Sequence, residues 1–170
     1  MSLKPQVSII MGSTSDLPVM EKAAARLDAL GVPFEILALS AHRTPREVEA
    51  FASGAHERGI KVIIGAAGMA AHLCGVIASM TSVPVIGVPI KASLEGVDAL
   101  YSIVQMPPGI PVATVGINAA ENAALLAVQM MATGDPELYQ RLEEYKASLK
   151  DKVVKANAEL AELKYSYKTN

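Results

Sequence analysis

Short apolar runs alternate with longer segments of helical composition along most of the chain. Five runs are bounded by glycine, proline or polar residues: Val7–Met11, Phe34–Leu39, Val62–Gly65, Val85–Val88 and Val112–Val115. Their hydrophobic residues are continuous rather than alternating, which is typical of strands covered on both faces. The helical segments include Val19–Leu30, one that ends near Gly59 and one that begins near Ala70. This order predicts an α/β fold, a doubly wound parallel sheet within three αβα layers.

From Asp135 onward the pattern changes to a single long helix, expected over about 136–164. Its apolar residues recur at spacings of three and four: Leu138, Leu142, Tyr145, Leu149, Val153, Ala156, Leu160 and Leu163. Such a helix is roughly 40 Å long, so one subunit would leave its far end uncovered. The stripe therefore favours homo-oligomerisation, and a helix folded along its own domain is the alternative. We expect one domain over residues 1–170, with an α/β core over about 7–134.

Composition narrows the class of protein. The chain has 170 residues, of which 51% are hydrophobic and 19% are charged, enough for one sizeable core. A net charge of −2 without a basic cluster argues against a nucleic-acid partner and favours a small-molecule ligand. Cys74 is the single cysteine, which excludes an internal disulfide and a multi-cysteine metal site. With no signal-peptide core and no apolar run near the roughly 18 residues of a membrane span, we expect a cytoplasmic protein that is not membrane-bound.

The segment Ser40–Pro45 places a histidine and an arginine between an apolar run and a helix start. Residues Thr44–Glu47 supply an N-cap, a proline at the first helical position and a capping-box acid. His42 therefore follows the carboxyl end of a strand, the edge at which open parallel sheets bind ligands. His42 can transfer a proton near neutral pH, and Arg43 can bind a phosphate through two hydrogen bonds. This edge is the expected site of chemistry.

A polar loop, Gly12–Asp16, follows the first apolar run. Its hydroxyls, backbone amides and one carboxylate suit a phosphate and a ribose together. It lacks the Gly-Lys-Ser ending of a Walker motif and has only one glycine, so it is not a Rossmann fingerprint either. Serine and aspartate before a helix are usually caps. The expected position beside His42 and Arg43, on the neighbouring strand, favours a binding role.

The third apolar run leads into Gly65–Gly75, a segment rich in small residues. Small side chains allow backbone amides to approach a planar ligand, and tight strand–helix packing is the alternative. For His72, a ligand contact and a structural hydrogen bond both stay open. Cys74 is expected to fill apolar space, because nothing indicates a lowered thiol pKa.

The segment Ser102–Pro111 combines three prolines with apolar residues. It predicts a rigid, buried connection rather than a helix. Met106 and the prolines are candidates to line a pocket or a subunit contact. To this point the residues indicate an enzyme for a phosphorylated small molecule, with His42 as its acid–base group.

Four segments occur together in the order and spacing of one known family: Met11–Asp16, Ser40–Pro45, Ala70–Leu73 and Ser102–Pro107. On these motifs the chain resembles the class I 5-(carboxyamino)imidazole ribonucleotide mutases, the PurE family of purine biosynthesis, from about Val7 to Leu142. The resemblance implies transfer of a carboxylate from the exocyclic nitrogen of the substrate to carbon 4 of its imidazole ring. It also implies catalysis without a metal or nucleotide cofactor, and a homo-octamer with pockets near subunit interfaces.

The resemblance further assigns roles to residues of this sequence. His42 is implied as the general acid and base, which removes the carbon 4 proton after trapped carbon dioxide has been attacked by the ring. The implied substrate-binding residues are Gly12, Ser13, Ser15, Asp16, Ser40, Arg43, Gly68, Ala70, His72 and Leu73. Met69 stands where this family is expected to have glycine, and Cys74 where proline is common, so the floor of the ring pocket is expected to differ.

Two alternatives stay open. The first is a class II carboxylase, which fixes free carbon dioxide on the same fold. It is disfavoured by Arg43 and by Ala70–Leu73, since class II members tend to have lysine after the histidine. The second is a flavodoxin-like module that binds flavin mononucleotide at the same sheet edge. The chain has no Trp, 2 Phe and 5 Tyr, which leaves little aromatic cover for a flavin ring.

Overall fold

A computed structural model describes residues 4–170, and within them the strands form one parallel sheet. Its five strands lie in the order β2-β1-β3-β4-β5. They are β1 (Val7–Met11), β2 (Phe34–Ala38), β3 (Val62–Gly68), β4 (Val85–Ile90) and β5 (Ala113–Thr114). The chain moves outward from β1 to β2 and then returns past β1 to β3. This reversal creates the switch point at which doubly wound sheets bind ligands.

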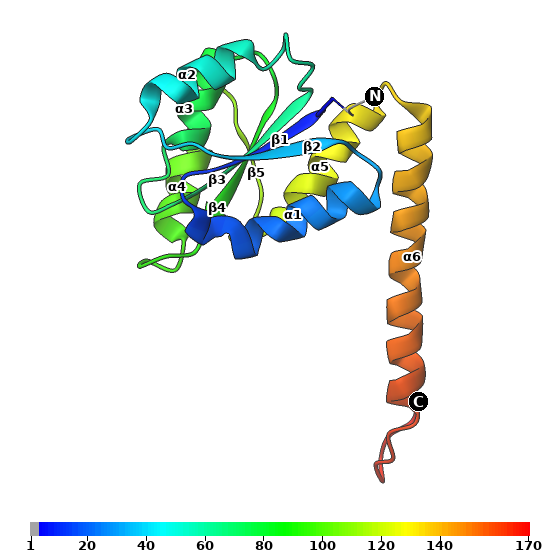
Figure 1. Cartoon of the computed structure of the whole chain (residues 1–170). Helices are drawn as coiled ribbons and strands as arrows, with labels where there is room; N and C mark the ends of the chain where they lie inside the picture. The colour runs from blue at the N-terminus through cyan, green and yellow to red at the C-terminus, as the bar shows by residue number, and fades with distance from the viewer. Residues whose placement is uncertain (1–3) are drawn as a thin grey trace.

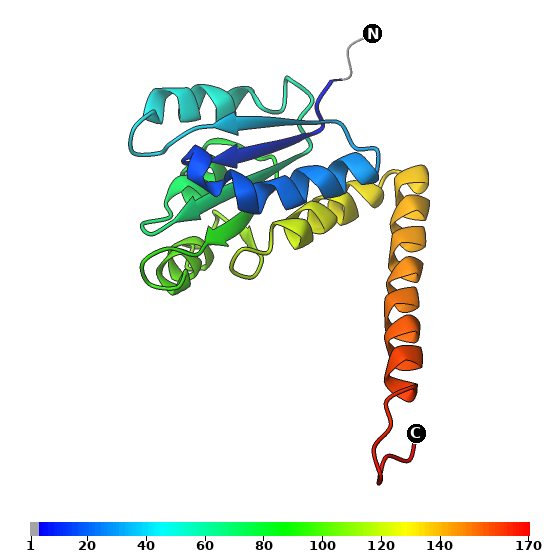
Figure 2. The ribbon, with the colours of Figure 1, turned by 60° about the horizontal axis from the view of Figure 1, so that its bottom comes forward.

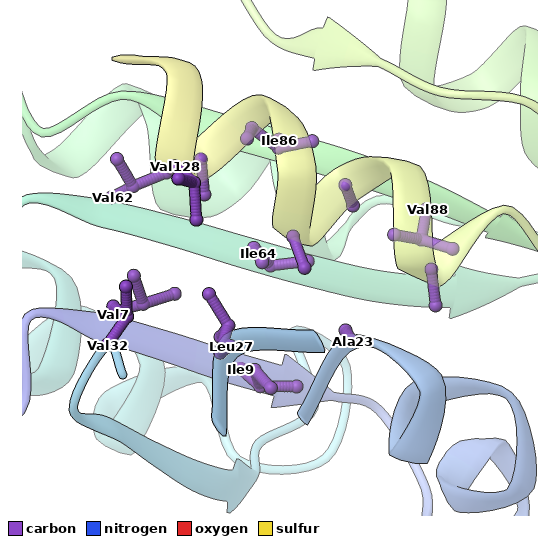
Figure 3. Close-up of a cluster of buried hydrophobic side chains, with 14 of the residues drawn as sticks. Val7, Ile9, Ala23, Leu27, Val32, Val62, Ile64, Ile86, Val88 and Val128 are labelled. Atoms are coloured by element: carbon purple, nitrogen blue, oxygen red, sulfur yellow. The ribbon is translucent and has the colours of Figure 1, made fainter. Parts of the chain in front are cut away.

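Helices cover both faces of the sheet, which confirms the predicted three-layer architecture (Figure 1). The helices of this part are α1 (Leu17–Ala29), α2 (Pro45–Gly54), α3 (Leu73–Met80), α4 (Val97–Val104) and α5 (Ala120–Ala132), with a short 3-10 helix η1 (Thr14–Asp16). One face packs against α1 and α5, where Leu27 and Val128 lie over Ile9, Ile64 and Ile86 (Figure 3). The other face packs against α2, α3 and α4.

Continuous apolar runs are explained by these two cores. Adjacent strand residues point to opposite faces, so Ile9 enters one core and Ile10 the other. Each fully buried aliphatic side chain contributes about 1.5–3 kcal/mol of transfer free energy. The edge strand β2 departs from the predicted burial, because Ile36 is 41% exposed. An edge strand has only one neighbour and less helix cover.

Two helix boundaries differ from expectation. Helix α3 begins at Leu73 rather than near Ala70. Met69, which has a φ of 54°, and residues 70–72 form the connection between β3 and this helix. Helix α2 ends at Gly54, and a turn carries the chain on to Gly59, whose φ of +87° suits glycine.

The prediction for Ser102–Pro111 is wrong in two respects. Residues Ser102–Val104 belong to α4, where Ile103 is buried in the core. Proline restricts the backbone of the residue before it, here Met106, and α4 has already ended at Val104, three residues before Pro107. The following prolines are exposed rather than buried within this subunit. Met106 and Ile110 are partly buried, and the thioether of Met106 packs against Gly75.

The C-terminal helix α6 (Pro136–Ala161) is anchored only near its beginning. The Asp135 carboxylate accepts a hydrogen bond from Leu138 N at 3.0 Å, and Leu138 and Leu142 are buried. Arg141 donates to the carbonyl oxygen of Leu30 at 2.7 Å, at the end of α1. Tyr145 also packs against this core, and beyond it the helix projects away from the sheet layers (Figures 1 and 2). It ends three residues before the predicted 164, and the alternative of packing along its own domain is wrong.

Residues 146–167 of this projecting segment are exposed throughout. They include the apolar side chains of Leu149, Val153, Val154, Leu160 and Leu163. Among the helices of residues 4–170, none is long and apolar enough to cross a membrane.

Candidate active site

The loops that follow β2 and β3 meet across the carboxyl end of β1. His42 lies in the first loop and His72 in the second, and their rings contact each other edge to face. The distance from His42 Nε2 to His72 Nδ1 is 2.8 Å, and the ring centroids are 4.9 Å apart. Because β1 lies between β2 and β3 in the sheet, this contact closes over the switch point.

Arg43 connects the loop after β2 to the loop after β1. Its Nη2 donates to the carbonyl oxygen of Gly12 at 2.5 Å, and its Nε donates to Ser40 Oγ at 3.4 Å. The backbone N of Arg43 also donates to Ser40 Oγ, at 3.2 Å. The guanidinium is therefore held at the sheet edge with donors left over for an anionic ligand.

The predicted capping box at the start of α2 is only partly confirmed. Thr44 is the N-cap residue and Pro45 is the first helical residue. The Thr44 hydroxyl, however, donates to the carbonyl oxygen of Ser40 at 3.1 Å and accepts from Ser40 N at 2.9 Å. Local bonding of a threonine to nearby backbone competes with capping. Here it closes the turn that presents His42 and Arg43.

The loop after β1 uses its hydroxyl groups in two different ways. Ser13 Oγ accepts from Ser15 N at 3.3 Å and caps η1, which leaves its hydroxyl hydrogen free to donate to a ligand. Ser15 Oγ donates to Asp16 Oδ1 at 3.4 Å. Asp16 is only 9% exposed, and burial raises the pKa of its carboxyl group, against a smaller lowering by the Ser15 hydroxyl. Burying a carboxylate is unfavourable, so this arrangement is better explained by a ligand than by stability.

The predicted binding residues in the loop after β3 differ in how accessible their side chains are. Gly68 lies against β4, where an added Cβ would be 3.3 Å from the carbonyl oxygen of Ile90. Ala70 and His72 are exposed at the same edge, whereas the side chain of Leu73 is buried in the core behind them. Leu73 can thus contribute only its backbone to a ligand.

Cys74 lies directly behind this loop. Its thiol donates to the carbonyl oxygen of Gly65 at 3.3 Å, and burial raises its pKa to about 12. Such a thiol is not nucleophilic at neutral pH, in agreement with the expected packing role.

Asn118 was not singled out from the sequence, although it stabilises the same sheet edge. Its φ is +57°, its side-chain oxygen accepts from Lys91 N at 2.9 Å, and its own N donates to Pro89 O at 2.8 Å. These bonds fix the loop after β5 to the loop after β4. Asparagine adopts positive φ more readily than most residues, and this is the only signal the sequence offered.

A separate hollow of about 840 Å³ opens at the opposite, amino edge of the sheet. It lies between the ends of α2 and α3 and the segment Gly109–Pro111, and its lining includes His56 and Met80. The acid–base and anion-binding side chains gather at the carboxyl edge instead. Within residues 4–170 there is no group of three or more His, Cys, Asp and Glu side chains arranged to hold a metal ion.

Comparisons with known proteins agree with this placement. A model of the family described as AIR carboxylase matches residues 6–152. The N5-carboxyaminoimidazole ribonucleotide mutase of Pyrococcus horikoshii is 56% identical over 163 residues, which cover 95% of this chain and 92% of that protein. The protein of the same name from Thermotoga maritima is 52% identical over 162 residues, 95% of each chain.

Longer proteins and a solved structure extend the comparison. The phosphoribosylaminoimidazole carboxylase of Saccharomyces cerevisiae is 55% identical over 89% of this chain, which corresponds to 27% of the yeast protein. The crystal structure of Treponema denticola PurE matches with a TM-score of 0.83 and 32% identity, covering 92% of this chain and 98% of that chain. The family match spans most of the sequence, and the two mutase relatives align over 95% of this chain. The chain therefore belongs to the AIR carboxylase family.

Proposed function

We propose that this protein is an N5-carboxyaminoimidazole ribonucleotide mutase, an isomerase of purine biosynthesis. Relatives of that name are 52–56% identical to it over most of both chains. The observation that carries the assignment is the histidine pair at the switch point, flanked by a guanidinium and a buried carboxylate. This set provides proton transfer, anion binding and hydroxyl recognition at one sheet edge.

In the proposed reaction, the bond between the exocyclic nitrogen and the carboxylate carbon breaks first. His42 donates a proton to that nitrogen as the bond breaks, which gives carbon dioxide and the aminoimidazole. Ring carbon 4 then attacks the carbon dioxide while both stay in the site. His42 removes the proton from carbon 4, which restores the aromatic ring. Holding the two fragments together replaces a bimolecular encounter with an effectively unimolecular step. A proton taken up by His42 is shared with His72 through their 2.8 Å contact.

The substrate is proposed to lie across the three loops. Arg43 binds the phosphate, while Ser13 and Asp16 hold the ribose–phosphate portion. Ser15, Ser40 and the backbone of Gly12 assist. The loop from Gly68 through Ala70 and His72 to Leu73 encloses the imidazole and its carboxylate.

The carboxylase alternative is not favoured by the comparisons. The curated relatives from Pyrococcus horikoshii and Thermotoga maritima, aligned over 92% and 95% of their own length, are named as mutases. Only 27% of the yeast carboxylase aligns with this chain. A flavodoxin-like binding module is not favoured either, since the matching family is one of enzymes.

We further infer a homo-octamer in the cytoplasm. Two apolar surfaces of this subunit support assembly: the α6 stripe from Leu149 to Leu163, and the exposed face of α4 formed by Val97, Tyr101 and Val104. Two separate self-association surfaces suit a closed assembly with more than one kind of interface. The reduced, buried thiol of Cys74 suits a reducing compartment.

The first experiment is an ultraviolet assay with N5-carboxyaminoimidazole ribonucleotide as the sole substrate, without ATP or added metal. We expect the wild type to convert the substrate rapidly. His42→Asn should lower kcat at least 1,000-fold while substrate binding is retained, since removal of a general acid–base group costs about 10²–10⁴-fold in rate. Failure of the folded wild-type oligomer to convert this substrate would overturn the assignment. Conversion of aminoimidazole ribonucleotide with bicarbonate in its place would support the carboxylase.

A further inference from the structure

Strained backbone is concentrated at the sheet edge that carries the site. Among residues 4–170, three residues other than glycine have positive φ: Met69 (54°), Glu95 (57°) and Asn118 (57°). They occupy the loops after β3, β4 and β5 respectively. Asn118 is accounted for by its hydrogen bonds, and asparagine tolerates this conformation. Methionine adopts it rarely, and its side chain has no strong hydrogen-bonding group to offset the strain.

Met69 also gains little from packing. Its side chain is 59% exposed, although an apolar side chain of this size is usually buried. Glycine would adopt the same φ freely. Neither local conformation nor the core of this subunit therefore explains a methionine at this position.

The position of Met69 is fixed from both sides. Gly68 precedes it and packs against Ile90 at the end of β4. Three residues later, His72 contacts His42 at 2.8 Å. The exposed thioether therefore projects from the short connection that joins the end of β3 to the histidine pair, at the rim of the proposed ring pocket.

We propose that Met69 is an apolar cover over the reacting imidazole, which retains carbon dioxide between the two half-reactions. This inference rests on the proposed function. Carbon dioxide is small and uncharged, so hydrogen bonds alone retain it poorly, and an apolar group that excludes water prevents its loss. A methionine side chain has three rotatable bonds and adapts its shape to a planar ligand. The strained backbone keeps its attachment point at the rim.

The test uses substrate labelled with ¹³C in its carboxylate, in buffer containing unlabelled bicarbonate. Label retained in the product and free aminoimidazole ribonucleotide are both measured, after subtraction of the substrate's decay without enzyme. Two variants separate side chain from backbone. Met69→Asn keeps a residue that tolerates positive φ but removes the apolar cover, whereas Met69→Leu keeps an apolar side chain of similar volume.

We expect the wild type and Met69→Leu to retain nearly all the label, and Met69→Asn to lose at least tenfold more of it as free carbon dioxide. The melting temperature of Met69→Asn should equal or exceed that of the wild type, which would exclude misfolding as the cause. Equal label retention in Met69→Asn and the wild type would overturn the proposal while leaving the mutase assignment intact. A wild type that converts no substrate would instead overturn the assignment itself.

Discussion

His42 Nε2 lies 2.8 Å from His72 Nδ1, although the two residues are 30 positions apart in the sequence. Two neutral imidazoles in such a contact must have one N–H donating to one lone pair. The contact therefore couples the tautomer of His42 to that of His72 and restricts the rotation of both rings. A base that must meet a ring carbon in one geometry benefits from both effects.

Removal of this hydrogen bond is expected to slow the chemical step. Asparagine can place an amide atom near the position of His72 Nδ1, whereas leucine cannot bond there. We expect His72→Leu to lower kcat about 100-fold, within the range for acid–base catalysis, and His72→Asn to stay within about tenfold of the wild type. Steady-state kinetics of the two variants test this. Equal kcat values in His72→Leu and the wild type would show that the pair has no catalytic role.

Arg43 should act mainly on substrate binding. Lysine retains the charge but cannot bridge Gly12, Ser40 and a phosphate with a planar set of donors. Loss of one charge-assisted hydrogen bond costs about 1.5–3 kcal/mol, or about 10- to 150-fold in affinity. We expect Arg43→Lys to raise KM by that factor with a smaller change in kcat. A fall in kcat at constant KM would place Arg43 in the chemical step instead.

Asp16 is expected to lower the stability of the folded protein at neutral pH and to raise its affinity for substrate. Burial raises the pKa of the Asp16 carboxyl group in the folded state. The protonated carboxyl therefore contributes to stability below its unfolded pKa of about 3.9, and this contribution is lost as pH rises through the folded pKa. We expect Asp16→Asn to raise the melting temperature at pH 7 by about 1–3 °C and to have little effect near pH 3. The same variant should lose at least tenfold in substrate affinity. A lower melting temperature at pH 7 would contradict this account.

Much of the sheet was predictable because its strands are continuous apolar runs. Val7–Met11 was predicted to the residue, since polar residues and Gly12 bound it. The beginning of α4 and the helical state of Ser102–Val104 were not, because they depend on Ala99 and Ile103 packing into the core. Local proline content could not reveal that tertiary contribution.

The site was predictable to the extent that it lies on neighbouring strands. Gly12 and Arg43 follow β1 and β2, which the doubly wound pattern places side by side. The sequence did not show which group His72 contacts. That contact depends on the strand order, which places β1 between β2 and β3 and so brings the loops after β2 and β3 together. The hydrogen bonds of Thr44 also stayed hidden, since capping and bonding to Ser40 use the same hydroxyl.

The far half of α6 should be needed for assembly. An aspartate within the apolar stripe would bury an unpaired charge in any subunit contact. We expect Val153→Asp to lower the mass measured by analytical ultracentrifugation to that of a smaller assembly. Ala158→Asp is the matched control, because Ala158 lies on the opposite side of the helix and is also exposed. Equal dissociation by both variants, or by neither, would count against the stripe as the interface.

The near half of α6 depends on an ion pair that should make stability sensitive to acid. Glu121 of α5 accepts hydrogen bonds from Arg26 of α1 at 2.6 and 3.1 Å and from the Tyr145 hydroxyl of α6 at 3.4 Å. The guanidinium also lies over the Tyr145 ring, 4.2 Å from its centroid. Hydrogen bonding by Arg26 lowers the pKa of Glu121, outweighing a smaller rise from burial.

A carboxylate with a lowered folded pKa stabilises the protein above its unfolded pKa, about 4.3, and loses that contribution as pH falls through the folded value. Because the Glu121 side chain is 45% exposed, solvent screening limits the effect to about 0.2–1 kcal/mol. We expect Glu121→Gln to melt about 1–3 °C below the wild type at pH 7, with the gap closing toward pH 3. Both proteins must be compared at one concentration, since assembly also shifts melting. A gap that stays constant from pH 7 to pH 3 would mean that Glu121 acts through packing rather than charge.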